Sequence, residues 1–373
     1  MENSAILYQL GLSLVPGIGA TLARKLLEET GSAQAIFQEK ASTLTKINGI
    51  GSIIAKNISG NGILQRADQE IEYMQKHKIK MMFFYDPDYP ERLKNCADAP
   101  IVFFHKGDIP SRMSHSLSII GTRKPSRHGR DLTISWVQAL AQKYPDIYII
   151  SGLAYGIDIT AHEAALKNNV KTLAVLGHGF HTIYPSEHRS AAIRILEEGA
   201  LMTDFFSHNM RETKNFIRRN RIIAGLSEAT LVVESKIKGG AMATVEMANS
   251  YNRDVFAIPG RPTDIRSVGC NYLIRSNQAI LASTPDDIPF ILDWEMSNGS
   301  KKGSKVNQIL PELSDSQKRL MDVLQKDELN INELGIILHV HPAKLTGDLL
   351  NLEFSGLIQA SPGGRFRSLE RYI

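Results

Sequence analysis

The chain of 373 residues contains only two cysteines, Cys96 and Cys270. Two cysteines supply neither a disulfide framework nor a cysteine-rich metal site, and they fit a reducing, cytoplasmic location. No apolar run reaches the roughly 18 residues that a membrane helix requires, so we expect no membrane partner. The first residues have no basic start and no clean apolar stretch, so we expect no signal peptide. These absences favour a soluble protein of two or three domains.

The chain also lacks a strong excess of charge of either sign. It has 43 Lys and Arg residues against 39 Asp and Glu residues, for a net charge of +4. A balance this mild does not identify a nucleic-acid-binding protein, so such a function must rest on local basic clusters. The Walker A loop and the complete Gly-x-Gly-x-x-Gly fingerprint are both absent. His178 and His181 lack a suitably spaced carboxylate or cysteine, so we predict no metal and no cofactor.

Residues 66–295 alternate short apolar runs with helical patterns. We predict helices between most of the apolar runs, including Asp131–Gln142, Ile157–Lys167 and Met242–Ser250. This alternation indicates an α/β domain with a doubly wound, mainly parallel sheet. The predicted strands are Met81–Tyr85, Leu117–Ile120, Ile147–Ile150, Thr172–Leu176, Leu201–Thr203, Thr230–Glu234 and Val255–Ile258.

Residues 1–65 form a separate, helical region. Val15–Gly19 and Ile47–Gly51 are similar glycine loops, each set between apolar stretches typical of helices. Glycine permits a tight turn and lets backbone N–H groups approach a phosphate, so we predict helix-hairpin-helix elements. The first loop, followed by Arg24 and Lys25, is the better candidate for DNA contact. The alternative is a pair of helical hairpins held only by glycine caps.

The C-terminal part has another character. Residues 296–313 are rich in Gly, Ser and Lys, which predicts a flexible linker. Residues 314–373 predict a winged helix-turn-helix domain. Its predicted elements are the helices Gln317–Gln325, Ile331–Leu338 and Pro342–Glu353, and a hairpin around Leu357–Ile358 and Phe366.

Several predicted strands are followed by turns suited to phosphate binding. Gly121-Thr122-Arg123 follows one strand directly. The carboxyl ends of strands in an open α/β sheet are the usual ligand sites, so we predict an anion site here. The glycine frees the backbone, the hydroxyl can bond a phosphate and the arginine can clamp it. The alternative is a solvated basic loop.

Three further turns have the same design, namely Ser151–Asp158, Gly177–Gly179 and Lys236–Gly240. Each combines glycines with a strand end or a helix start, so backbone N–H groups can line a pocket. We interpret Asp158 as a residue that caps or offsets the dipole of the following helix.

The most specific segment is Phe216–Ser227. Five basic residues and one acidic residue lie between Arg211 and Arg221, and the run leads straight into an apolar helix. This pattern predicts positive charge at the ligand edge of the sheet, where each neutralised phosphate adds about one unit to the salt dependence of binding. The alternative interpretation, a basic face exposed to solvent, fits Arg211 better than it fits Arg218–Arg221. At least one of these arginines is expected to bond within the protein.

Taken together, these motifs resemble the DNA-processing protein A family, called DprA or Smf. The matching segments are Gly121–Arg123, Ser151–Asp158, Val175–Gly179, Tyr184–Pro185, Arg219–Gly225, Val255–Gly260 and Gly269–Ile274. The resemblance implies an extended Rossmann-like domain that binds single-stranded DNA. It implies a sterile-alpha-motif-like or helix-hairpin-helix domain before it and a winged helix after it. It also implies natural transformation as the setting, loading of the RecA recombinase, and a homodimer formed around Asn271–Ala282.

We therefore predict a DNA-binding protein without catalytic residues. Phosphates are expected to be held by Arg123, Arg218, Arg219 and Arg221. The full predicted DNA-binding set is Gly121, Thr122, Arg123, Gly152, Gly177, Gly179, Arg189, Arg218, Arg219, Asn220, Arg221, Lys238, Gly239 and Gly240.

Two other functions are possible. Gly239–Glu246 also resembles, more loosely, a loop of nucleotide phosphoribohydrolases in which the glutamate acts on the N-glycosidic bond. Here Ala243 stands where that loop needs a glycine, which hinders backbone approach to a phosphate. The other alternative is a regulator that reads duplex DNA with its winged helix. The third helix of that domain offers only Lys344 as a basic side chain, which disfavours base reading.

Overall fold

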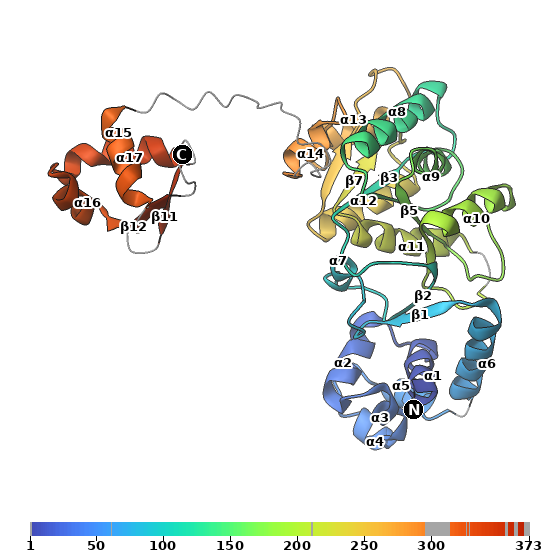
Figure 1. The fold of residues 1–373 in the computed structure, drawn as a ribbon. Coiled ribbons are helices and arrows are strands. Elements are labelled where there is room, and N and C mark those ends of the chain that lie inside the picture. Colours follow the sequence, from blue (N-terminus) through green and yellow to red (C-terminus); the bar gives the residue numbers. More distant parts are fainter. Residues whose placement is uncertain are drawn as a thin grey trace. The chain divides into compact units, whose positions relative to one another are not determined.

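A computed structural model describes residues 2–60, 62–209, 212–294, 314–325, 327, 329–354, 357–361 and 365–368. The chain divides into two compact units, Met1–Ser297 and Asn298–Ile373 (Figure 1). The predicted linker, 296–313, lies outside the described residues.

The first unit contains a nine-stranded sheet of order β1-β2-β6-β5-β4-β3-β7-β8-β9. Strands β3 to β9 pair in parallel, and β2 joins β6 and β1 in antiparallel fashion. All seven predicted strands are present, whereas β2 and β9 were not predicted. The strands are β1 (Lys80–Phe83), β2 (Val102–Gly107), β3 (His115–Ile120), β4 (Ile147–Ser151), β5 (Lys171–Val175), β6 (Ala200–Thr203), β7 (Ala229–Val232), β8 (Asp254–Ala257) and β9 (Ile280–Leu281).

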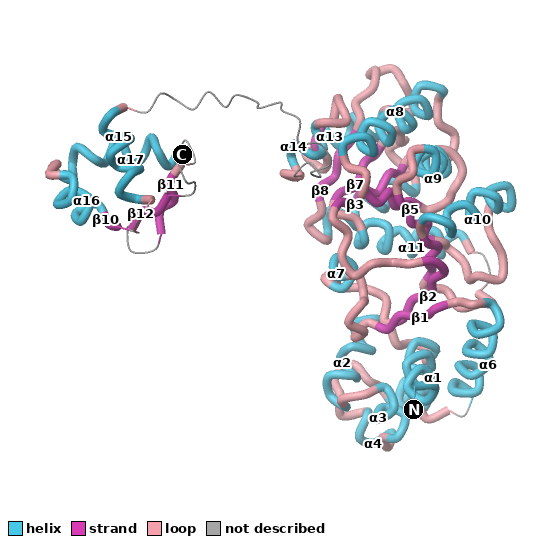
Figure 2. The backbone as a smooth tube through the Cα atoms, in the orientation of Figure 1, coloured by secondary structure: helices cyan, strands magenta, loops and turns pink. Residues whose placement is uncertain are grey.

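Helices cover both faces of this sheet (Figure 2). Along β3, Leu117 and Ile119 point to the face packed by α8, α9 and α14, and Ile120 points to the face packed by α11 to α13. Burial on both faces explains why the parallel strands are almost continuously apolar. The helices are α7 (Glu91–Lys94), α8 (Arg127–Lys143), α9 (Ile157–Lys167), α10 (Arg189–Glu198), α11 (Thr213–Leu226), α12 (Gly240–Ser250), α13 (Val268–Arg275) and α14 (Asp287–Ile291), with a 3-10 turn at Ser186–His188.

The N-terminal helices pack next to β1 and β2 (Figure 1). Gly19 and Gly51 are the N-caps of α2 and α5, and both preceding turns contain a glycine with positive φ, +88° at Gly17 and +98° at Gly49. The two predicted helical hairpins are therefore present. Their core, including Leu26, is continuous with the α11 face of the sheet. The helices are α1 (Glu2–Leu14), α2 (Ala20–Thr30), α3 (Ala33–Gln38), α4 (Ala41–Leu44), α5 (Ser52–Ile58) and α6 (Gly62–His77).

The described residues of the second unit form three helices and a three-stranded sheet of order β10-β12-β11. Capping boxes at Ser314 and Asn330 start α15 and α16, and the predicted helices begin within two residues of these starts. Strand β10 was not predicted. The elements are α15 (Asp315–Leu324), β10 (Leu329–Asn330), α16 (Ile331–Leu338), α17 (Pro342–Phe354), β11 (Ile358–Ser361) and β12 (Arg365–Ser368).

Candidate nucleic-acid interface

A pocket of about 380 Å³ opens at the carboxyl ends of the central strands. Strand β3 pairs with β4 on one side and with β7 on the other, so the strand order reverses here. Ligands of open α/β sheets bind at this kind of switch point. The pocket is lined by the turn after β3, the turn after β4, the Ser235–Gly240 turn after β7 and the first turns of α11.

The turn after β3 is held close to its neighbours by glycine and by a buried carboxylate. A Cβ atom at Gly121 would lie 2.6 Å from Ile157, so only glycine fits without movement. The Thr122 N–H donates to the Glu234 carbonyl oxygen (2.7 Å), and the Ser126 N–H and hydroxyl donate to the Glu234 carboxylate (2.9 and 2.5 Å). The Glu234 side chain therefore fixes the loop that presents Arg123. Glu234 was not among the predicted site residues.

Arg219 forms the floor of the pocket. It is buried, and its guanidinium donates to the carbonyl oxygens of Gly152 (2.6 Å) and Val175. A Cβ at Gly152 would lie 2.5 Å from that guanidinium, so the glycine is needed to admit it. Asp158, in the first turn of α9, accepts the Gly152 N–H (3.2 Å) as well. Burial lowers the pKa of Arg219 to about 10 and raises the pKa of Asp158, and each group partly offsets the shift of the other.

The rim of the pocket is basic and aromatic. Arg123, Lys236 and Lys238 are exposed and line it, and the buried Asp158 is its single acidic lining residue among the described residues. The Arg123 guanidinium lies 5.9 Å from the centre of the Phe216 ring, which in turn lies 5.7 Å from the Tyr184 ring. Cations beside aromatic rings match a ligand with phosphates and bases.

The turn before α12 leaves its backbone open. Nothing lies within 4 Å of a Cβ built at Gly239 or Gly240, and both line the pocket. The Asn220 side chain donates to the Gly240 carbonyl oxygen (3.1 Å), which ties this turn to α11. The open N–H groups at the start of α12 suit an anion.

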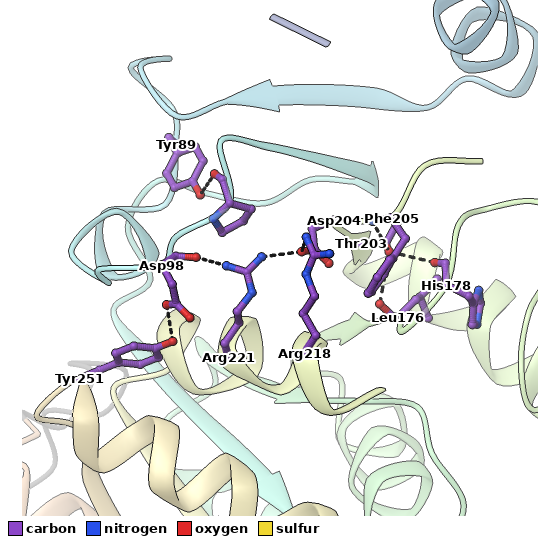
Figure 3. Close-up of polar contacts among 11 residues, drawn as sticks. Tyr89, Asp98, Leu176, His178, Thr203, Asp204, Phe205, Arg218, Arg221 and Tyr251 are labelled. Atoms are coloured by element: carbon purple, nitrogen blue, oxygen red, sulfur yellow. Dashed lines mark hydrogen bonds and ion pairs between the residues drawn. The ribbon is translucent and has the colours of Figure 1, made fainter. Parts of the chain in front are cut away.

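Arg218 and Arg221 do not line this pocket, which corrects the expectation that four arginines hold phosphates together. Both point away from it to Asp204 at the end of β6, with distances to Asp204 Oδ2 of 3.2 and 2.5 Å (Figure 3). Arg221 also donates to the Asp98 carbonyl oxygen, and Tyr251 donates to the Asp98 carboxylate (2.5 Å). Helical periodicity is the reason, because residues two positions apart lie on opposite sides of α11.

The remaining predicted residues lie around the pocket rather than in it. Gly177 packs against Phe216, where a Cβ would lie 2.7 Å from the ring, and Gly179 packs against the Phe206 carbonyl oxygen. Arg189 is exposed at the start of α10 and does not line the pocket. The structure thus brings together eight of the predicted residues, Gly121, Thr122, Arg123, Arg219, Asn220, Lys238, Gly239 and Gly240.

Phe216 and Lys236 line the pocket but were not in the predicted set. A signal for both was present in the sequence. Phe216 lies one helical turn before Arg219 and Asn220, and Lys236 lies in a predicted phosphate turn. Glu246, the residue required by the phosphoribohydrolase alternative, is exposed on α12 and is not a lining residue.

In the helical region, Arg24 is engaged within the protein. Its guanidinium donates to the Ala97 carbonyl oxygen and lies 5.0 Å from the centre of the Phe84 ring. Within the described ranges, no helix is long and apolar enough to cross a membrane, and no group of three or more His, Cys, Asp or Glu side chains is placed to hold a metal ion.

Comparison with known proteins agrees with this architecture. The model of the DNA recombination-mediator protein A family matches residues 80–292, more than half of the chain. The chain belongs to that family. A SAM-like helix-hairpin-helix tandem matches residues 10–59, and a DprA winged helix domain matches residues 306–364. The predicted family and fold class, a Rossmann-like domain with flanking helix-hairpin-helix and winged helix domains, are confirmed.

Relatives from several bacteria cover much of the chain. Protein Smf of Synechocystis is 29% identical over 98% of this chain and all of that protein, and Protein Smf of Escherichia coli is 36% identical over 75% of each. The crystal structure of DprA from Streptococcus pneumoniae has a TM-score of 0.60 at 28% identity, covering 78% of this chain and 98% of that one. DprA from Helicobacter pylori, described for its single-stranded DNA binding mode, shares the fold with a TM-score of 0.52 at 24% identity, covering 58% and 98%.

Proposed function

We propose that this DNA-processing protein binds single-stranded DNA in the pocket at the switch point and passes it to a RecA recombinase during natural transformation. The observation that carries the proposal is the exposed Arg123 guanidinium beside Phe216 at a basic pocket rim. A phosphate accepts bonds from Arg123, Lys238 and the open turn before α12. A neighbouring base stacks on the Phe216 side of the rim.

This combination favours a single strand over a duplex. In a duplex the bases are stacked on one another, so an aromatic side chain at the pocket rim has no free base face to contact. In a single strand every base has such a face, and binding is tolerant of sequence. Nothing in this arrangement requires a covalent step, so the protein acts by binding alone.

A homodimer would raise the avidity of such a site. The region expected to form it, Asn271–Ala282, includes most of α13 and β9, the edge strand of the sheet, where Leu281 is 47% exposed. Two pockets on one dimer would bind two segments of one strand at raised effective concentration. We place this activity in the cytoplasm, where the buried free thiols of Cys96 and Cys270 stay reduced.

The test is a salt titration of binding to matched single-stranded and duplex oligonucleotides, with the full chain and with a truncated protein ending at Trp294. We expect both proteins to prefer the single strand, because the pocket lies in the first unit. A duplex preference that disappears on truncation would instead place the activity in the winged helix and favour a regulator. Loading of RecA is measured separately, as the rate of recombinase filament growth on protein-covered strands.

A further inference from the structure

We propose that the bound strand leaves the pocket toward β8 and crosses the loop 259–267, where Arg261 and Arg266 bind its phosphates. This proposal rests on the proposed function, because it extends the DNA path from the same pocket. It assigns a binding surface to a loop outside the pocket lining, and it gives the path of the DNA a direction along the sheet.

Strand order provides the first argument. Strands β3, β7 and β8 are parallel neighbours, so the loops that follow them lie side by side along the carboxyl edge of the sheet. Neighbouring strands are about 4.8 Å apart, so the loops after β3 and β8 start about 10 Å from each other. A strand held at Arg123 therefore reaches the 259–267 loop within a few nucleotides.

Direct contacts hold this loop against the pocket rim. The Arg266 Nε donates to the Lys124 carbonyl oxygen (3.2 Å), next to Arg123. Just after the loop, in the first turn of α13, the Gly269 N–H donates to the Ser235 carbonyl oxygen (2.8 Å), in the turn after β7. The loop is thus held to two of the turns that line the pocket, the turn after β3 and the turn after β7.

Charge distinguishes the loops after β3, β7 and β8 from the loops after β4 and β5. The loops after β3, β7 and β8 carry six exposed basic residues near their strand ends, namely Arg123, Lys124, Lys236, Lys238, Arg261 and Arg266. Among the nearby acids, Asp158 and Glu234 are buried, and Asp264 accepts the Arg266 backbone N–H (2.9 Å). The loops that follow β4 and β5 have no Lys or Arg before Arg189. Phosphates are therefore attracted to the part of the carboxyl edge of the sheet that carries the loops after β3, β7 and β8.

Apolar side chains alternate with these cations. Ile237 is 48% exposed between Lys236 and Lys238, and Ile265 is 63% exposed beside Arg266. Isolated exposed isoleucines are common on proteins. Here, the two isoleucines lie among the six basic residues named above. They can pack against the faces of the unpaired bases that accompany the bound phosphates.

The experiment compares a short oligothymidine of about 6 nucleotides with a long one of about 20 nucleotides by fluorescence anisotropy. The test variant is Arg261→Ala with Arg266→Ala, in the full chain. The matched control is Arg112→Ala with Lys143→Ala, which removes two exposed charges before β3 and β4, at the opposite edge of the sheet. Arg123→Ala tests the pocket itself. Arg261→Lys with Arg266→Lys keeps the charge and should bind as the unmodified chain does.

We expect the test variant to bind the long oligonucleotide about tenfold more weakly and the short one unchanged. The slope of log affinity against log salt should fall by about 1.4 on the long oligonucleotide, since each lost phosphate contact removes about 0.7. If the test variant binds the long oligonucleotide as tightly as the control does, the DNA path does not cross this loop. If Arg123→Ala still weakens binding of both oligonucleotides in that case, the proposed function of the pocket is retained. If Arg123→Ala has no effect, the proposed function itself fails.

Discussion

The two faces of α11 carry arginines with different tasks. Arg219 and Asn220 face the pocket together with Phe216, whereas Arg218 and Arg221 face Asp204 on the other side. The same short basic segment therefore lines the proposed DNA pocket on one face and pairs with a carboxylate of the protein on the other. The difference lies in the groups that each guanidinium meets. Arg219 donates to the Gly152 and Val175 carbonyl oxygens at the pocket, whereas Arg218 and Arg221 pair with the buried Asp204 carboxylate.

The face toward Asp204 also joins the helical region to the sheet. Asp204 begins the segment between β6 and α11, and three residues later Ser207 is held by α6. The Glu70 carboxylate accepts the Ser207 N–H (2.7 Å) and hydroxyl (2.8 Å) and pairs with Arg66 (2.9 Å). This face therefore positions α11, and through α11 it positions the pocket.

The largest expected effect is that of Asp204→Ala on stability. Its side chain is 2% exposed and opposes Arg221, whose side chain is 10% exposed. Removing one partner leaves a buried charge without compensation, so we expect a loss of about 3–5 kcal/mol in urea unfolding. Glu212→Ala, which removes an exposed partner of Lys214, is the control and should change stability by under about 0.5 kcal/mol. Equal losses in the two variants would show that the Asp204 face does not stabilise α11.

The next effect separates the two faces by DNA binding. Arg123→Ala should weaken binding of single-stranded DNA by about 10- to 100-fold, the value of a charge-assisted bond to phosphate. Arg218→Ala should change it by less than about threefold, because this side chain, though 59% exposed, faces Asp204 and not the pocket. Fluorescence anisotropy at one salt concentration measures both. An effect of Arg218→Ala as large as that of Arg123→Ala would reverse the assignment of the faces.

The smallest expected effect, taken over a single pH unit, concerns His162, a buried histidine of α9. Burial, together with the nearby charge of Arg219, lowers the pKa of His162 to about 3. The folded state therefore keeps His162 neutral while the unfolded chain takes up a proton below about pH 6.5. Stability is full above that pH and falls toward pH 3, by at most about 1.4 kcal/mol per pH unit.

Urea unfolding at two pH values below about 6.5 measures this loss. His162→Gln should lose less stability over the same interval, because glutamine does not titrate. A pH dependence that is identical in the variant would show that His162 is not the responsible group.

Much of the fold was predictable because its signals are local. The strands were recognised from their apolar runs, and α9 and α16 were predicted with the bounds that the structure has. The phosphate turn at Gly121–Arg123 was predicted because it follows a strand directly. Strand β9 has only two residues, too few for a periodic signal, and β2 joins the sheet through antiparallel pairs with β1 and β6 that are distant in sequence.

The sequence by itself determined the alternation of strands and helices, the glycine turns and the basic segment that includes Arg218–Arg221. Only the tertiary structure decided which of those arginines meets the pocket, because that depends on the rotation of α11 against the sheet. It also decided the roles of two buried carboxylates: Glu234 holds a loop far from it in sequence, and Asp204 pairs with arginines of α11. The physical reason is that the periodicity of helices and strands depends on residues close together in sequence. The partner of a buried charge depends on how elements distant in sequence pack against one another.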